Sequence, residues 1–206
     1  MVVVTPPRTG PETVAHFVRT HRDWIIRTAR ELAPVTPPAL PDRLALPAVG
    51  ESLRIELDSA AGARAPRWHR RGDKLVLRAA SNSPAGALPL LRDWLRERAR
   101  ETGPGLVAAL SAETGLVPSR LQFRLQRSRW GSCSSRGTVS LNACMLFLQP
   151  RELRYLVLHE LCHLKHMHHG PAFWALVARH EPHCRELDRG LNAAWRRVPG
   201  WVFAPP

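Results

Sequence analysis

The stretch Leu153-Arg-Tyr-Leu-Val-Leu-His-Glu-Leu-Cys-His-Leu164 decides the fold, because a helix built from it separates a core-facing stripe from a group of metal-binding side chains. At about 100° per residue, four apolar residues fall within an arc of roughly 80° and predict the core-facing stripe. His159 and His163 fall on a different face of the same helix, so the two patterns do not compete. The stripe consists of Leu153, Val157, Leu161 and Leu164.

The motif His159-Glu160-Leu-Cys-His163 has the spacing of a metal site on a helix. Two histidines four residues apart lie about 6 Å apart along one face, so both imidazoles can reach one zinc ion. Glu160 flanks that face, where a carboxylate can hold a water molecule and take its proton instead of binding the metal. We therefore expect His159 and His163 to bind zinc and Glu160 to act as a general base. The alternative is an ordinary helix with polar histidines.

A hydrolytic zinc site needs a third protein ligand, with the fourth position left to water. His166 shares the helical face but lies about 10 Å further along the axis than His159, and three ligands in one row cannot surround an ion tetrahedrally. His168 and His169 precede Gly170-Pro171, where a chain reversal can bring a side chain back over the first two histidines. The geometry favours His168 or His169 over His166 and leaves both open.

The N-terminal part of the chain, residues 1–82, is predicted to form a small lobe. An amphipathic pattern over 11–33 favours a helix, and five prolines in 34–47 favour an extended connector. Apolar and polar residues alternate over 53–57 and predict a strand, which is expected to pair as a hairpin with a second strand at 74–78.

The remaining chain, residues 83–206, is predicted to combine helices with one hairpin. Alternation over 121–125 and a turn cluster at 130–137 predict a strand that is followed by a returning strand at 138–147. Besides the histidine helix, which begins at Pro150, the expected helices span 83–100, 104–115, 171–180 and 183–197. This order of helices and strands predicts an α+β protein of two domains, 1–82 and 83–206.

Composition restricts the class and the compartment. Hydrophobic residues at 44% and charged residues at 23% are typical of a globular enzyme. No apolar run approaches the roughly 18 residues that span a bilayer, and no export signal is visible, so we expect a cytoplasmic protein without a membrane partner. The four cysteines contain no C-x-x-C pair, which excludes a zinc ribbon and favours buried thiols over disulfides.

The net charge of +13 predicts a basic surface. Lys74 and Lys165 are the only lysines, so 28 of the 30 basic residues are arginines. Such a surface raises encounter rates with nucleic acids and nucleotides, and we expect weak association with nucleic acid rather than a dedicated site. Four arginines around the predicted hairpin suit phosphate binding. They are Arg124, Arg127, Arg129 and Arg136.

Three blocks of the chain resemble the YgjP-like family of metal-dependent hydrolases, relatives of the SprT-like and minimal zincin peptidases. They are Arg129-Trp-Gly-Ser-Cys-Ser-Ser-Arg-Gly-Thr-Val-Ser-Leu-Asn142, Tyr155-Leu-Val-Leu-His-Glu-Leu-Cys-His-Leu-Lys-His166 and His169-Gly-Pro-Ala-Phe-Trp174. The resemblance implies a zincin-like fold with a helical core and a small antiparallel sheet. It also implies His169 as the third zinc ligand, and the strand 138–146 as the sheet edge that pairs with an extended peptide.

Several residues of these blocks allow a functional and a structural interpretation. Tyr155 lies one turn before His159 and is expected to pack, and Trp174 is expected to fill the core beneath the site. Four others either line the cleft or serve packing and turns. They are Arg129, Trp130, Ser132 and Asn142.

The function that the sequence favours is hydrolysis of a peptide or protein by one zinc ion, held by His159, His163 and His169 with Glu160 as base. The first alternative uses the same site on the phosphoanhydride of a nucleoside triphosphate, which the arginine excess suits. The second is a metal-stabilised basic module that binds nucleic acid without turnover.

Overall fold

The computed structural model describes residues 10–23, 39–58, 67–79 and 83–204. The chain divides into two compact units, Met1–Pro37 and Pro38–Pro206. The first unit contains helix α1 (Pro11–Thr20), and the part of the predicted helix beyond residue 23 lies outside the described residues. None of the described helices is long and apolar enough to cross a membrane.

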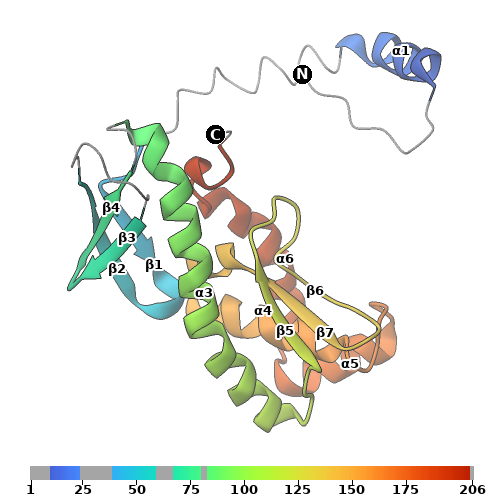
Figure 1. Ribbon diagram of the computed structural model, residues 1–206. Coiled ribbons are helices and arrows are strands. Elements are labelled where there is room, and N and C mark those ends of the chain that lie inside the picture. The colour runs from blue at the N-terminus through green and yellow to red at the C-terminus, as the bar shows by residue number, and fades with distance from the viewer. Residues whose placement is uncertain (1–9, 24–38, 59–66, 80–82, 205–206) are drawn as a thin grey trace. The chain divides into compact units, whose positions relative to one another are not determined.

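In the second unit, four short strands form one sheet in the order β1-β2-β4-β3 (Figure 1). The central pair β2 and β4 is parallel, and the two outer pairs are antiparallel. Leucines alternate along β1 and β4 and are buried, since alternate side chains of a strand point to one face of the sheet. The strands are β1 (Arg43–Leu46), β2 (Glu51–Leu57), β3 (Arg67–Arg71) and β4 (Lys74–Arg78).

Two predictions about this sheet are wrong. The strands β2 and β4 do pair, but in parallel, and the hairpin joins β3 to β4 through Gly72 at a φ of 64°. Strand β3 has no apolar alternation, because all of its side chains except that of Trp68 are exposed. Strand β1 lies within the segment 34–47 that was expected to be a connector, where the prolines masked the alternation of the buried Leu44 and Leu46.

One long helix, α3 (Pro84–Thr114), contacts both sheets and the helix that carries the histidines. The predicted break before Pro104 is wrong, since the helix continues through this residue. Buried side chains lie on both sides of Pro104, and their packing outweighs the roughly 3 kcal/mol that an interior proline costs. The helix begins after the N-cap Ser83 and ends, as expected, at Gly115 in the left-handed conformation.

A second sheet has the strand order β5-β7-β6, with β7 parallel to β5 and antiparallel to β6. The prediction that the strand from residue 138 is a sheet edge is therefore wrong: it lies in the centre, and β6 forms one edge within the expected turn cluster. Strand β7 ends at Asn142, because its side-chain oxygen accepts a hydrogen bond from the amide of Cys144 (3.1 Å) and begins a 3-10 helix. The strands are β5 (Arg120–Arg124), β6 (Gly131–Cys133) and β7 (Thr138–Asn142).

Three helices, α4 (Pro150–Cys162), α5 (Pro171–His180) and α6 (Cys184–Ala194), complete the second unit. Helix α4 contacts α3, α5, α6 and β6, so the segment that carries the histidines is at the centre of the core. The mixed α and β class is confirmed, although each sheet contains a parallel pair. The domain boundary after residue 82 stays a prediction. All four cysteines are free, and three of them are buried.

Candidate metal centre

Helix α4 ends earlier than the histidine-rich segment does. Its last helical residue is Cys162, and His163 is the C-cap. The chain then turns, and the N-terminus of α5 follows at Pro171, so the residues between the two helices fold back over the end of α4. This reversal is what a third ligand from the loop requires.

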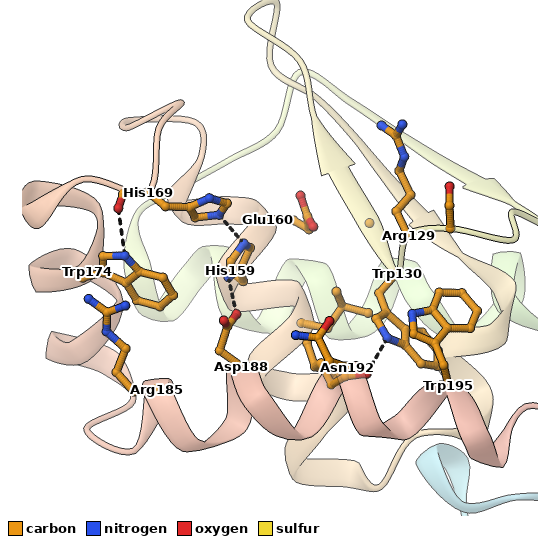
Figure 2. Close-up of a pocket in the computed structure, with 14 residues that line it drawn as sticks. Arg129, Trp130, His159, Glu160, His169, Trp174, Arg185, Asp188, Asn192 and Trp195 are labelled. Carbon is orange, nitrogen blue, oxygen red and sulfur yellow. Dashed lines mark hydrogen bonds and ion pairs between the residues drawn. The ribbon is translucent and has the colours of Figure 1, made fainter. Parts of the chain in front are cut away.

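Three histidine side chains meet at this end of α4. The Nε2 atom of His159 lies 3.2 Å from Nε2 of His163 and 3.0 Å from Nε2 of His169. One nitrogen from each ring can be chosen so that all three lie within 4.8 Å of one another, the only such group of three or more potential ligands in the described part of the chain. His166 and His168 do not belong to the group, and His168 is exposed. Figure 2 shows His159 and His169 facing one another above α6.

The hydrogen bonds of the outer ring nitrogens determine which nitrogens carry lone pairs. A neutral imidazole has one N–H group and one lone pair. Nδ1 of His163 lies 2.9 Å from the carbonyl oxygen of His166, which can only accept, so Nδ1 donates. Tyr155 donates its hydroxyl proton to Asp188 (3.0 Å), and the hydroxyl oxygen lies 3.3 Å from Nδ1 of His159, which therefore donates as well.

The Nε2 atoms of His159 and His163 consequently face one another with lone pairs at 3.2 Å. Such a pair is repulsive unless a proton or a cation lies between the rings. Burial, together with the adjacent imidazoles of His163 and His169, lowers the pKa of His159 to about 3, which disfavours the proton. The three histidines thus fit a metal ion, and they offer the nitrogen ligands that zinc accepts.

Asp188 of α6 supports His159 from behind. Its Oδ1 atom accepts the hydrogen bond from Tyr155 and lies 3.8 Å from Nδ1 of His159. At 3.8 Å this is an electrostatic contact rather than a hydrogen bond, and the Tyr155 hydroxyl links the carboxylate to Nδ1. Supporting groups of this kind orient the ring of a metal-binding histidine. The expectation that Tyr155 only packs is incomplete, because this fully buried side chain also connects α4 to Asp188.

Glu160 is buried beside the histidines and lacks a complete set of partners. Its side chain is only 5% exposed, and Oε2 has no hydrogen-bond partner among the described residues. Burial raises the pKa of Glu160 to about 8, against the opposing charge of Arg129. A bound cation would favour the ionised form again.

Gly131 makes room for this carboxylate. A Cβ atom at this position would lie 2.6 Å from Oε1 of Glu160 and 2.7 Å from its Cδ atom, which is closer than a real side chain allows. Strand β6 can therefore approach α4 as closely as it does only with glycine here. The sequence placed this residue in a turn, and the reason for the glycine is the carboxylate.

A cleft of about 560 Å³ opens beside the histidines and Glu160. One wall is the segment that leads into β6, and the opposite side is a face of α6, from which Arg185, Asp188 and Asn192 project toward the site (Figure 2). These three residues have no signal of their own in the sequence, because their spacing on a polar helix is also that of an ordinary solvent face. The remaining lining residues are Ser128, Arg129, Trp130, Gly131, Leu156, His159, Glu160, His169, Trp174, Leu191 and Trp195.

Two tryptophans, Trp130 and Trp195, connect the two walls of this cleft. Trp130 donates its Nε1 hydrogen to the carbonyl oxygen of Leu191 (2.8 Å) and stacks on Trp195 with ring centroids 4.2 Å apart.

Trp174 does not fill the core as expected. It is half-buried at the cleft and donates its Nε1 hydrogen to the carbonyl oxygen of His169 (2.9 Å).

The sequence allowed both a functional and a structural interpretation for four residues. The structure places some of them in the lining of the cleft and others outside it. Arg129 and Trp130 line the cleft, whereas Ser132 does not. Asn142 is fully buried and donates to the carbonyl oxygens of Gln126 (2.7 Å) and Arg129 (2.8 Å), so it shapes the loop before β6. Of the four arginines expected to suit phosphate, only Arg129 lines the cleft.

Comparison with known proteins gives one family. The chain matches the model of the YgjP-like family, described as a metallopeptidase domain, over residues 1–194, and this confirms the resemblance seen in the sequence. None of the curated proteins matches the chain.

Two solved structures are similar to part of the chain. One is the metallopeptidase zymogen abylysin of Pyrococcus abyssi, with 26% identity over 44% of this chain and 92% of that chain and a TM-score of 0.40. The other is the metallopeptidase zymogen jannalysin of Methanocaldococcus jannaschii, with 21% identity over 44% of this chain and 93% of that chain and a TM-score of 0.39.

Proposed function

We propose that this chain, which belongs to the YgjP-like family of metallopeptidase domains and is a metal-dependent hydrolase, is a zinc peptidase. In this proposal His159, His163 and His169 bind one zinc ion, and Glu160 is the general base. One observation carries the proposal: lone pairs of imidazole nitrogens converge beside a buried carboxylate that has an unpartnered oxygen.

Zinc, when bound, supplies a Lewis acid that lowers the pKa of water and polarises a carbonyl group. The protein's own contribution begins with Glu160, whose unpartnered Oε2 is available to accept a proton from water. Gly131 leaves the space that the other oxygen occupies, and Asp188 orients His159 through the Tyr155 hydroxyl, which lies between the carboxylate and Nδ1. The half-buried Trp174 and the buried Trp130 cover the cleft walls with apolar surface.

The open edge of β6 supports a peptide as substrate. In the antiparallel pair β6–β7, Trp130 accepts a hydrogen bond from Asn142 (2.7 Å), and Ser134 donates to Thr138 (2.9 Å). Because hydrogen-bonded pairs alternate along such a ladder, the main-chain groups of the residues between them, Gly131 and Cys133, point away from β7. An extended peptide can pair with these groups next to Glu160.

The test compares the zinc-loaded wild type with Glu160→Gln. We expect the variant to retain one zinc ion per chain by elemental analysis and to lose about 10²- to 10⁴-fold in the rate of hydrolysis of mixed peptide substrates. Glu97→Gln, which changes an exposed carboxylate on α3, serves as the matched control and should leave the rate unchanged. Undiminished peptide hydrolysis by Glu160→Gln would refute the assignment of the base.

A further inference from the structure

Three planar groups are stacked at one end of the cleft. The guanidinium carbon of Arg185 lies 3.6 Å from the centroid of the Trp174 ring. On the other side the Trp174 ring stacks on His169, with centroids 5.7 Å apart and an interplanar angle of 30°. Figure 2 shows this order from α6 upward: Arg185, Trp174, His169.

A hydrogen bond holds the indole of the stack, and α6 carries the arginine. The Nε1 hydrogen bond of Trp174 to the carbonyl oxygen of His169 fixes the indole relative to a proposed zinc ligand. Arg185 lies in the first turn of α6, one turn before Asp188, which is bonded to Tyr155. The backbone of Arg185 is therefore fixed on the helix that carries Asp188, and the indole of Trp174 gives its guanidinium a defined surface to stack on.

Arg185 has no acidic partner in the described part of the chain. Among the described residues, no carboxylate lies within 4.0 Å of its guanidinium, whereas arginines elsewhere, such as Arg98 and Arg154, pair with glutamates. Asp188 lines the same cleft, but its Oδ1 atom already accepts the proton of Tyr155. Arg185 is thus a positive charge at the cleft that no described carboxylate neutralises by an ion pair.

A stacked guanidinium presents a defined binding edge. Its face is occupied by the indole, in the arrangement that favours a cation over tryptophan, while the N–H groups at its edge have no hydrogen-bond partner among the residues that the structure describes. Those N–H groups match the two oxygens of a carboxylate, and little conformational freedom is left to lose on binding. We propose that Arg185 and Trp174 form a carboxylate subsite, which selects peptides with an acidic side chain or a free C-terminus near the scissile bond.

The subsite deepens the proposed peptidase function and rests on it. One indole ring separates the guanidinium from His169. At about 3.3 Å per residue of extended chain, a stack of this thickness spans two or three residues of substrate. The recognised carboxylate therefore belongs to a residue two or three positions from the bond that is cut.

The experiment measures selectivity rather than rate alone. The zinc-loaded full chain is given pools of internally quenched peptides in which one position is fixed as Glu or as Gln, and further pools with a free or an amidated C-terminus. The same pools are given to Arg185→Gln, to Arg185→Lys and to the matched control Arg189→Gln, which changes another exposed arginine of α6 that does not line the cleft.

For the wild type we expect kcat/KM to be about tenfold or more higher for the acidic member of at least one pair of pools, as charge-assisted hydrogen bonds provide. The pair of pools that shows this difference identifies the recognised group as an acidic side chain or as a free C-terminus. In Arg185→Gln the ratio should fall to near one, in Arg185→Lys it should be intermediate, and in Arg189→Gln it should be unchanged. A wild-type ratio near one in every pair, or a ratio that survives in Arg185→Gln, overturns the subsite.

A binding measurement separates this inference from the proposed function. Glu160→Gln, loaded with zinc, is titrated into fluorescently labelled peptides of the same pools, and anisotropy reports the dissociation constants. If no pool is hydrolysed by the wild type, the peptidase proposal fails. The subsite then still stands if acidic peptides bind about tenfold more tightly than their neutral partners only when Arg185 is present, and it fails with the peptidase if they do not.

Discussion

The four-stranded sheet and the end of α4 differ in how their charged side chains are paired. In the sheet region, Glu51 accepts hydrogen bonds from Arg98 (2.6 and 3.0 Å) and from Arg70 (3.1 Å), and Lys74 pairs with Glu56 (2.6 Å). All of these groups are at least partly exposed. At the end of α4, by contrast, Glu160 is buried with an oxygen that no described residue contacts by a hydrogen bond.

This difference distinguishes residues that stabilise the folded state from residues whose polar groups are available to a ligand. Charges that are satisfied within the protein lower the free energy of the folded state and need nothing further. Buried polar groups without partners cost free energy, and they persist where a ligand or a reaction uses them. Variants at the α4 end should therefore change metal binding or turnover, and variants in the sheet should change stability alone.

The largest expected effect comes from a proposed ligand. His169→Ala removes one of three imidazoles and should weaken zinc binding on the order of 1,000-fold, since the ligand set supplies most of the binding free energy. A competition titration against a chromophoric chelator measures the affinity. His168→Ala is the matched control, because this exposed neighbour lies outside the histidine group. Equal loss in both variants would contradict the assignment of His169.

Gly131→Ala should act on turnover and leave zinc binding in place. The added Cβ atom would lie 2.6 Å from Oε1 of Glu160, so the carboxylate must shift. A displacement of about 1 Å can cost roughly 100-fold in rate, and we expect a loss of this size in kcat at an unchanged zinc content. Gly190→Ala, where a Cβ atom meets nothing within 4 Å, is the control. Normal kcat in Gly131→Ala would show that the contact has no bearing on catalysis.

Asp188→Asn should have a smaller effect, and on the metal. The amide keeps the shape of the side chain but loses the charge that supports Nδ1 of His159. We expect zinc affinity to fall about tenfold, at the lower end of what such supporting partners contribute. Glu186→Gln removes an exposed carboxylate of the same helix and should leave the affinity as it is. Unchanged affinity in Asp188→Asn would restrict Asp188 to holding Tyr155.

The smallest effect belongs to the sheet. Glu51→Gln should lower the free energy of unfolding by about 1 kcal/mol at neutral pH, without changing zinc content or kcat. Burial raises the pKa of Glu51, but the hydrogen bonds and charges of Arg98 and Arg70 outweigh it and lower the pKa overall. Stability from a lowered pKa is present above the unfolded-state value and is lost as the pH falls through the folded-state value. Urea denaturation should therefore show the difference at neutral pH and little of it in strong acid.

The sequence could predict those features that depend on residues close together in the chain. The motif of His159, Glu160 and His163 depends on the geometry of one helix, so its spacing alone brought these residues together. His169 lies beyond a chain reversal. Helix geometry could predict that the third ligand comes from this reversal, but it could not choose between His168 and His169. Arg185 and Asp188 reach the cleft only because α6 packs against α4, and no pattern within α6 records that partner.

The two sheets show the same limit. Strand β5 was predicted because its pattern is local, but its parallel pairing with β7 depends on the insertion of β6 between them in the chain. Helix α3 was predicted in two pieces because Pro104 is a local breaker, whereas the core that carries the helix through it is tertiary. Local rules thus give the elements, and packing gives their direction and length.

The stacked pair of Trp130 and Trp195 provides the cleft with an optical reporter of its own. Two indoles with centroids 4.2 Å apart couple electronically, and the coupling is sensitive to the separation and angle of the rings. Since one ring belongs to the segment before β6 and the other follows α6, any opening of the cleft would alter the circular dichroism that this pair produces. Peptide binding could then be followed in the unlabelled protein, as a change in the width of the cleft.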